Sequence, residues 1–252
     1  MIDFSARRNE LMPAVVKLAE AAQSEVRRRH NQTFTVQDDL AANLDDLILD
    51  LLETEYRMFL EAQQKTGGQM ITEYLKGASW TGVEKLTDIE DAQANANRIF
   101  ADLDAMFMSF AQSRRSRAGG SFERHLIFLL DALGLPFEHG SNIDGGSPDF
   151  LLPRTELYES NPASVVLITA KRTLRERWRQ IIIEGFKTPR YLLATIDDSA
   201  SEANLNRMAQ HRIDLVVPKS VIEATPHYAN ALNVISFADM YTKRILPSSE
   251  DW

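Results

Sequence analysis

The sequence predicts an α/β fold, with a mixed central sheet flanked by helices and a helical region before it. Two patterns support this prediction. In the first part of the chain, apolar residues recur every three or four positions, which is typical of amphipathic helices. In the second part, short runs of Val, Ile and Leu alternate with helical segments, which is typical of a sheet covered on both faces. We therefore expect a helical N-terminal region over residues 1–111 and an α/β core over residues 112–252.

The helical pattern is clearest in residues 40–62, where acidic residues fall between the apolar ones, as on a solvated helix face. Breaks are expected where small residues gather. Residues 66–68 include two adjacent Gly and predict the end of a helix. Residues 116–120 predict a loop, and residues 121–134 then predict an apolar helix closed by Gly134.

Five segments of the core region predict strands, because each is short, rich in Val, Ile and Leu, and bounded by turn residues. They are residues 148–152, 163–171, 190–196, 213–218 and 232–237. Helical segments separate several of them, notably residues 174–186 and 203–211.

The composition excludes several classes of site. The chain has no Cys, which rules out disulfides, zinc-thiolate sites and Cys nucleophiles. Its first residues have no apolar run of the kind a signal peptide needs, and no run approaches the ~20 apolar residues of a membrane span. We expect a cytoplasmic protein that does not enter a membrane. The motifs of nucleotide-binding loops, zinc proteases and serine hydrolases are also missing from the sequence.

The distribution of charge tells more about partners than the net charge. A net charge of −8 weakly disfavours nucleic acid, because binding to phosphates relies on Lys and Arg. Two windows are nevertheless basic. Residues 112–125 hold four Arg against one Glu, and residues 171–190 hold seven Lys or Arg against two Glu. An acidic protein with two basic windows is compatible with a DNA-binding cleft.

Two residues at the ends of neighbouring predicted strands indicate a chemical function. Asp149 follows Pro148 at the start of one strand, and Lys171 ends the next. Metal-assisted cleavage of a phosphodiester needs carboxylate oxygens, which Mg²⁺ prefers, and a cation near the water or the phosphate. These two side chains can meet at one edge of the sheet if the strands pair. Pro-Asp in a turn is most often structural, so only the combination indicates a nuclease.

The wider pattern resembles the EcoRII–NgoMIV group of type II restriction endonucleases, within the PD-(D/E)xK superfamily. The usual pattern places an acid two residues before the Lys, where this chain has Thr169. In the group that the chain resembles, the second carboxylate has moved onto the following helix, where Glu184 stands thirteen residues after Lys171. The resemblance implies a restriction-endonuclease-like sheet, with Asp149, Lys171 and Glu184 as catalytic residues. Glu123 matches a further acidic residue of the group.

The same resemblance implies a role for each of these residues. Asp149 and Glu184 would bind Mg²⁺, and Glu123 would act behind them or at a second metal ion. Lys171 would orient or activate the attacking water and stabilise charge on the phosphate. Taken singly, Glu184 could be a solvated helix residue, and Glu123 could simply favour a helix N-terminus.

A basic–acidic–basic triplet, Arg175-Glu176-Arg177, begins four residues after Lys171. In the CCGG- and CCNGG-reading members of the group, such a triplet opens a helix that enters the major groove. Arg can donate to O6 and N7 of guanine, and Glu can accept from N4 of cytosine. A structural alternative stays open, because Thr173 and Glu176 also form a capping box that would leave the arginines on a solvated face.

The upstream basic window resembles a segment of the EcoRII-like enzymes that passes near the DNA minor groove. Gln112 stands where the resemblance implies a glutamine that reads the minor-groove edge. Arg114, Arg115 and Arg117 are candidate phosphate contacts. A basic surface loop is the alternative.

The resemblance implies a palindromic target in double-stranded DNA with a CCGG or CCNGG core, cut to leave 5′ overhangs. Palindromes are read by two-fold dimers, so we expect a homodimer in which the helical region supports dimerisation and grips DNA. Pairing of dimers into tetramers is left open. Two other functions also stay open: a nuclease of the same fold in repair or transposition, without base specificity, and a DNA-binding protein without catalytic activity.

Overall fold

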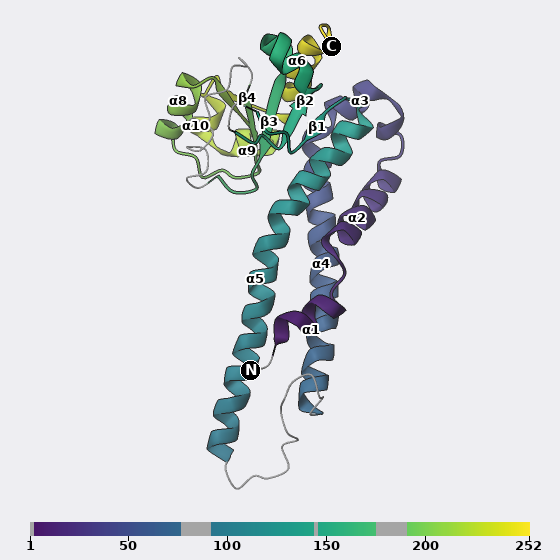
Figure 1. Cartoon of the computed structure of the whole chain (residues 1–252), viewed down its shortest axis with the longest axis vertical. Helices are drawn as coiled ribbons and strands as arrows, with labels where there is room; N and C mark the ends of the chain where they lie inside the picture. Colours follow the sequence, from purple (N-terminus) through teal and green to yellow (C-terminus); the bar gives the residue numbers. More distant parts are fainter. Residues whose placement is uncertain (1–2, 77–91, 144–145, 175–190) are drawn as a thin grey trace. The chain divides into compact units, whose positions relative to one another are not determined.

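The computed structural model describes residues 3–76, 92–143, 146–174 and 191–252 (Figure 1). By its internal contacts the chain forms two compact units. Unit 1 comprises Met1–Ala22 and Glu53–Ser121, and unit 2 comprises Gln23–Leu52 and Phe122–Trp252. The division at residue 111 that the sequence suggests stays a prediction. None of the helices in the described part of the chain is long and apolar enough to cross a membrane.

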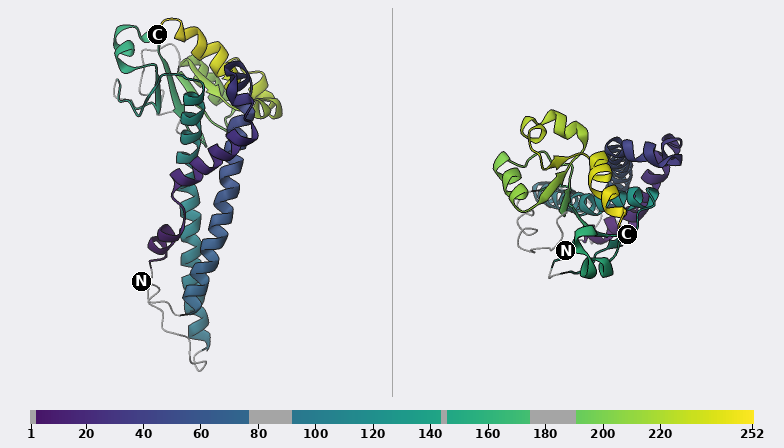
Figure 2. Two further views of the ribbon diagram at one scale, coloured as in Figure 1. Left: turned by 90° about the vertical axis from the view of Figure 1, so that its right-hand side faces the viewer. Right: turned by 90° about the horizontal axis from the view of Figure 1, so that it is seen from above.

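Unit 1 is helical. It contains α1 (Phe4–Leu11) and parts of three longer helices, α2 (Val15–Arg29), α4 (Leu44–Leu75) and α5 (Ala92–Ala132). Within this unit α4 and α5 lie side by side in both views (Figures 1 and 2). The helical N-terminal region predicted from the apolar periodicity is therefore confirmed.

The core of unit 1 lies between these two helices. Met70 of α4 packs in one cluster with Met106 and Phe110 of α5, and all three side chains are buried. Beside them the hydroxyl of Tyr74 donates to the carboxylate of Asp102 at 2.9 Å.

Two breaks predicted from small residues are wrong. α4 continues without interruption through Gly67 and Gly68, and α5 continues through Gly119 and Gly120. A Gly inside a helix costs about 1 kcal/mol relative to Ala, whereas burying one large apolar side chain such as Met70 stabilises by roughly 1.5–3 kcal/mol. Packing therefore outweighs local propensity here.

In the described residues of unit 2, six strands form one sheet and follow one another in sequence order. The first three strands pair antiparallel, and the remaining neighbours pair parallel. All five predicted strands are present, and a sixth precedes them. Their bounds are β1 Glu138–His139, β2 Phe150–Leu152, β3 Val166–Ala170, β4 Tyr191–Ala194, β5 Ile213–Val216 and β6 Val234–Ile235.

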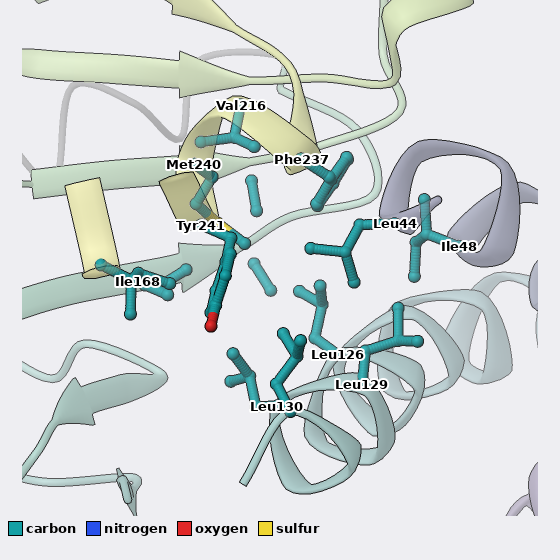
Figure 3. Packing of buried hydrophobic residues seen from close by; sticks show 14 of the residues in the cluster. Leu44, Ile48, Leu126, Leu129, Leu130, Ile168, Val216, Phe237, Met240 and Tyr241 are labelled. Atoms are coloured by element: carbon teal, nitrogen blue, oxygen red, sulfur yellow. The ribbon is translucent and has the colours of Figure 1, made fainter. Parts of the chain in front are cut away.

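Side chains of the central strands alternate between two cores, as the two-residue period of a strand requires. On one face Ile168 and Val216 pack against Leu126 and Leu130 of α5 and against Leu44 of α4 (Figure 3). Gly134 ends α5 with φ +68°, as predicted from the sequence.

On the other face Leu167, Leu193 and Leu215 pack against three short helices. These are α8 (Glu202–Gln210), α9 (Lys219–Ala224) and α10 (Pro226–Ala229). Burial on both faces explains why the strands read as continuous apolar runs rather than alternating ones.

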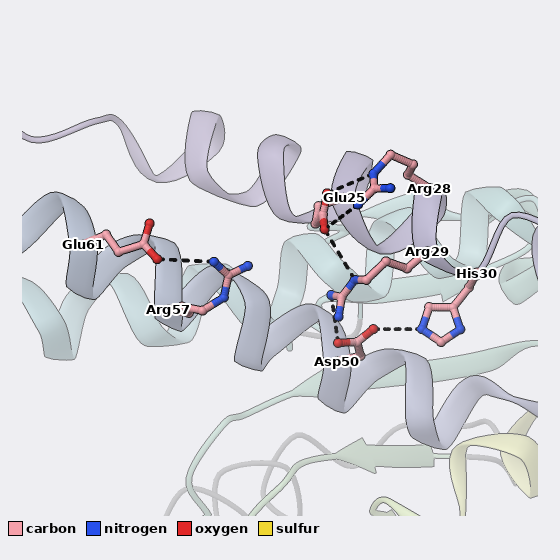
Figure 4. A network of polar contacts seen from close by, with 7 residues as sticks. All are labelled: Glu25, Arg28, Arg29, His30, Asp50, Arg57 and Glu61. Carbon is pink, nitrogen blue, oxygen red and sulfur yellow. Dashed lines mark hydrogen bonds and ion pairs between the residues drawn. The ribbon is translucent and has the colours of Figure 1, made fainter.

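Short elements complete unit 2. They are η1 Thr33–Thr35, α3 Gln37–Ala42, α6 Thr155–Ser160, η3 Pro162–Ser164, α11 Phe237–Met240, η4 Tyr241–Ile245 and α12 Leu246–Ser249. Within this unit the end of α2 is tied to α4, because Arg29 and His30 both contact the carboxylate of Asp50 at 2.9 Å (Figure 4). Partly exposed ion pairs of this kind contribute little each.

Candidate active site

Asp149 and Lys171 meet at one edge of the sheet. Asp149 immediately precedes β2 and Lys171 immediately follows β3, and these strands pair antiparallel with Phe150 opposite Ile168. Nζ of Lys171 donates to Oδ2 of Asp149 at 2.9 Å. The side chains of Asp149 and Lys171 are 18% and 29% exposed, so solvent and a ligand can reach them. The structure thus brings together the two residues whose spacing suggested a site.

Backbone pairing fixes both residues. The N–H of Ala170 donates to the same Oδ2 of Asp149 at 2.7 Å. The N–H of Lys171, the residue after β3, donates to the carbonyl of Ala194, the last residue of β4, at 2.9 Å. The N–H of Gly140 donates to the carbonyl of Asp149 at 3.0 Å. A site built on strand ends in this way is positioned more closely than one built on a free loop.

Thr169 stands where the usual superfamily pattern has its second acid, but its surroundings are those of a core residue. Its side chain is buried, at 4% exposure, and its Oγ1 lies 2.6 Å from the hydroxyl of Tyr191 on β4. This polar contact satisfies the buried hydroxyl. Glu184, predicted to supply the missing carboxylate, lies outside the described residues.

Glu123 lies in α5, and its carboxylate contacts His139 of β1. Nε2 of His139 is 2.5 Å from Oε1 of Glu123, and both side chains are partly exposed. His139 pairs with Phe150, the residue that follows Asp149, and its ring centroid lies 5.4 Å from that of Phe150. Glu123 is therefore held beside the strand that begins after Asp149.

The sequence did not single out His139. It lies in a two-residue strand, too short to show the apolar alternation from which strands are recognised. Its place opposite Phe150 follows from strand pairing, which the sequence does not display.

The donor set suits a hard divalent cation. Asp149 and Glu123 offer only carboxylate oxygens, which Mg²⁺ prefers, and the chain has no thiolate to favour a softer metal. Within the described ranges, no group of three or more His, Asp or Glu is arranged so that it could hold a metal ion.

The predicted minor-groove segment lies on α5 of unit 1. The side chains of Gln112 and Arg114 are exposed, and that of Arg115 lies outside the described residues. Arg117 is half-buried. Its Nη1 donates to the carbonyl of Pro13 at 2.8 Å, and its Nε donates to Oγ of Ser113 at 3.1 Å. The contact of Arg117 with a DNA phosphate stays a prediction. To make it, the guanidinium would have to leave the carbonyl of Pro13 and the hydroxyl of Ser113.

Arg117 also has an unusual electrostatic environment. Burial lowers the pKa of its guanidinium below the usual range, and the neighbouring charge of Arg8 lowers it further. The guanidinium lies over the ring of Phe59, 5.8 Å from the centroid. The predicted base-reading triplet Arg175-Glu176-Arg177 lies outside the described residues, which end at Leu174 on that side.

Comparison with known proteins shows a family and relatives. The family described as EcoRII C terminal matches residues 84–241. Over 144 residues the chain is 35% identical to the type II restriction enzyme SsoII of Shigella sonnei, covering 53% of this chain and 47% of SsoII. Over 132 residues it is 33% identical to the type II restriction enzyme EcoRII of Escherichia coli, covering 50% of this chain and 33% of EcoRII. The match thus spans about half of SsoII and a third of EcoRII.

Two solved structures have a similar fold. Metal-depleted Ecl18kI in complex with uncleaved, modified DNA matches with a TM-score of 0.79 and 25% identity, over 99% of this chain and 83% of Ecl18kI. The complex of restriction endonuclease PspGI with substrate DNA matches with a TM-score of 0.70 and 18% identity, over 100% of this chain and 99% of PspGI. These matches confirm the restriction-endonuclease-like mixed sheet predicted from the sequence. Since the family match extends over more than half of the residues, the chain belongs to the EcoRII C-terminal family.

Proposed function

We propose that this protein is a type II restriction endonuclease that hydrolyses phosphodiester bonds of double-stranded DNA with Mg²⁺. The observation that supports it most directly is the contact between Lys171 and Asp149, 2.9 Å apart at a sheet edge with exposed surface. The named relatives of the chain are type II restriction enzymes, and the similar structures are protein–DNA complexes.

Each residue of the site has a chemical role in this proposal. Asp149 and Glu184 bind the metal ion, and Glu123 acts behind them or at a second ion. When bound there, Mg²⁺ would supply Lewis-acid chemistry, which offsets negative charge on the phosphate and favours deprotonation of the attacking water. Lys171 holds the attacking water in place and offsets negative charge on the phosphate. The N–H of Ala170 and the ammonium of Lys171 both fix one carboxylate oxygen, which orients Asp149 before any ligand arrives.

Target recognition is assigned to the triplet Arg175-Glu176-Arg177 in the major groove and to Gln112 in the minor groove. Arg114, Arg115 and Arg117 contact phosphates. The proposed target is a palindrome with a CCGG or CCNGG core, cut with 5′ overhangs by a homodimer in the cytoplasm. Two-fold symmetry supports the dimer, because each subunit then meets an identical half-site.

The test is cleavage of a plasmid that contains both CCGG and CCNGG sites, in the presence of Mg²⁺. Asp149→Ala and Lys171→Ala should abolish cutting while the melting temperature stays near that of the wild type, because both residues lie at the sheet edge. Lys219→Ala is a matched control, since Lys219 is 70% exposed in α9. Near-normal cutting by a well-folded Asp149 or Lys171 variant would remove the proposed site.

The same assay separates the alternatives. Discrete bands, followed by sequencing of the cut ends, would give the site and the stagger. A smear would indicate a repair or transposition nuclease without base specificity, and metal-independent DNA binding without nicking would indicate a protein that is not catalytic.

A further inference from the structure

Three residues separate Lys171 from the proposed base-reading triplet, and the last of them is held by a carboxylate from the segment after the neighbouring strand. The backbone N–H of Leu174, the residue before Arg175, donates to Oδ2 of Asp197 at 2.7 Å. Asp197 follows β4, which is the parallel neighbour of β3. A hydrogen bond from N–H to a carboxylate is short and strong because its acceptor is charged.

Thr195 reinforces this connection from a buried position. Its Oγ1 accepts from the N–H of Asp197 at 3.0 Å. The same hydroxyl donates to the carbonyl of Arg172 at 3.4 Å. Its side chain is fully buried. The segment that leads to the triplet is thus fastened at Arg172 as well as at Leu174.

Asp197 is itself held in place. Its other carboxylate oxygen, Oδ1, accepts from the N–H of Ser199 at 2.8 Å, and its carbonyl accepts from the hydroxyl of Tyr228 at 3.2 Å. Tyr228 is fully buried in α10, and the side chain of Leu174 is buried in the same apolar cluster. Both partners of the Leu174–Asp197 hydrogen bond are therefore anchored to the core.

We propose that Asp197 is a positioning residue for base recognition. It fixes the backbone at Leu174, the last described residue before the triplet, and it thereby couples the segment that follows to the cutting position at Lys171. The inference rests on the proposed function, in which Arg175, Glu176 and Arg177 read bases. Contacts to base edges are sensitive to small displacements, whereas phosphate contacts supply affinity without sequence information. Loss of Asp197 should therefore reduce discrimination between sequences rather than DNA binding in general.

The experiment compares dissociation constants for two duplexes, one with the target sequence found from the cut ends and one with that sequence scrambled. Ca²⁺ replaces Mg²⁺ to prevent cutting. Asp197→Ala should lower the ratio of the two constants about tenfold, which is within the range for losing a bidentate base contact. Asp197→Asn should retain most of the ratio, because its amide oxygen can still accept from Leu174. Asp198→Ala is the matched control, since this exposed neighbour makes the same change of charge.

The two dissociation constants come from one preparation, so a fraction of inactive protein changes both equally and leaves their ratio unaltered. An unchanged ratio for Asp197→Ala, or equal losses on both duplexes, would overturn the proposal. If Asp197→Ala does not fold, Thr195→Val removes the hydroxyl that supports Asp197 and should lower the ratio in the same direction. An unchanged ratio there would overturn the proposal as well.

Arg177→Ala, measured in parallel, separates the positioning role of Asp197 from base reading by the triplet. If Arg177→Ala lowers the ratio and Asp197→Ala does not, only the positioning role fails. If Arg177→Ala leaves the ratio unchanged, base reading by the triplet fails and the positioning role fails with it.

Discussion

The hydroxyl of Thr169 on β3 lies 2.6 Å from that of Tyr191 on β4, and both side chains are buried. Thr169 stands at the position where the usual PD-(D/E)xK pattern has an acid. An ionised carboxylate at this place would lie among buried apolar side chains and would lose its hydration. The buried hydroxyl pair therefore agrees with a second metal ligand located elsewhere, and it makes Thr169 the natural control for Glu184.

Glu184→Ala should lower cleavage steeply, and more Mg²⁺, or Mn²⁺ in its place, should partly restore it, because a metal ligand has been lost. Thr169→Ala should reduce cleavage much less under the same conditions. The measurement is the cleavage rate as a function of metal concentration for both variants. If Thr169→Ala were the more damaging change, the assignment of the second carboxylate to Glu184 would be wrong.

Arg177→Ala should weaken binding to CC/GG-containing DNA by roughly 1–3 kcal/mol more than binding to a scrambled duplex, since a bidentate contact to guanine is lost. A residue that contacts phosphate alone would weaken both complexes equally and reduce the salt dependence of binding. Titrations at several salt concentrations, with Ca²⁺ in place of Mg²⁺, separate these outcomes. Equal losses would reduce the triplet to a phosphate contact and leave a nuclease of unknown specificity.

Asp45→Ala should destabilise unit 2 by about 3 kcal/mol, because buried N–H groups left without an acceptor each cost about 1–3 kcal/mol. The buried carboxylate of Asp45 accepts from the backbone N–H groups of Lys219, Phe237 and Ala238. Urea unfolding of the variant measures the loss. Asp46→Ala is the control, since its side chain is exposed in the same turn of α4, and a similar loss there would contradict the assignment.

Glu138 makes stability depend on pH on the acid side. The hydroxyl of Thr155 donates to its carboxylate and lowers the pKa of Glu138 below the usual range. A carboxyl group with a lowered folded pKa stabilises the fold above its unfolded pKa of about 4.3, and this contribution is lost as pH falls through the folded pKa.

Glu138→Gln should therefore be less stable than the wild type at neutral pH, and the difference should shrink below about pH 4.3. Urea unfolding at a series of pH values measures it, with Glu159→Gln, an exposed residue of α6, as the control. A difference that stays constant with pH would show that the hydrogen bonds of Glu138 do not depend on its charge.

The sequence was sufficient to predict the architecture of the sheet and the closeness of Asp149 and Lys171. Both depend on local patterns: apolar runs bounded by turns mark the strands, and an antiparallel pair of neighbouring strands brings the start of one to the end of the other. The helix breaks at Gly67 and Gly119 were predicted wrongly because the burial that stabilises those helices involves partners distant in sequence.

Other parts of the site depend on contacts that no local pattern records. His139 reaches Glu123 only through the pairing of β1 with β2, and Asp197 reaches Leu174 only because β3 and β4 lie side by side. Asp and His are common beside turns, so nothing in the residue types distinguishes these two from others of their kind.

The contact between Asp45 and Phe237 joins residues 192 positions apart and closes unit 2. During synthesis the chain emerges from the ribosome N-terminus first. Asp45 is therefore exposed long before the N–H groups that donate to its carboxylate have been made. The site at Asp149 lies in the same unit, whose first segment, Gln23–Leu52, must wait for Phe237 before this contact can form. A nascent chain that has not yet reached Phe237 therefore lacks this contact, and for a protein proposed to cut DNA the unit that holds the candidate site stays unfinished until that residue has been made.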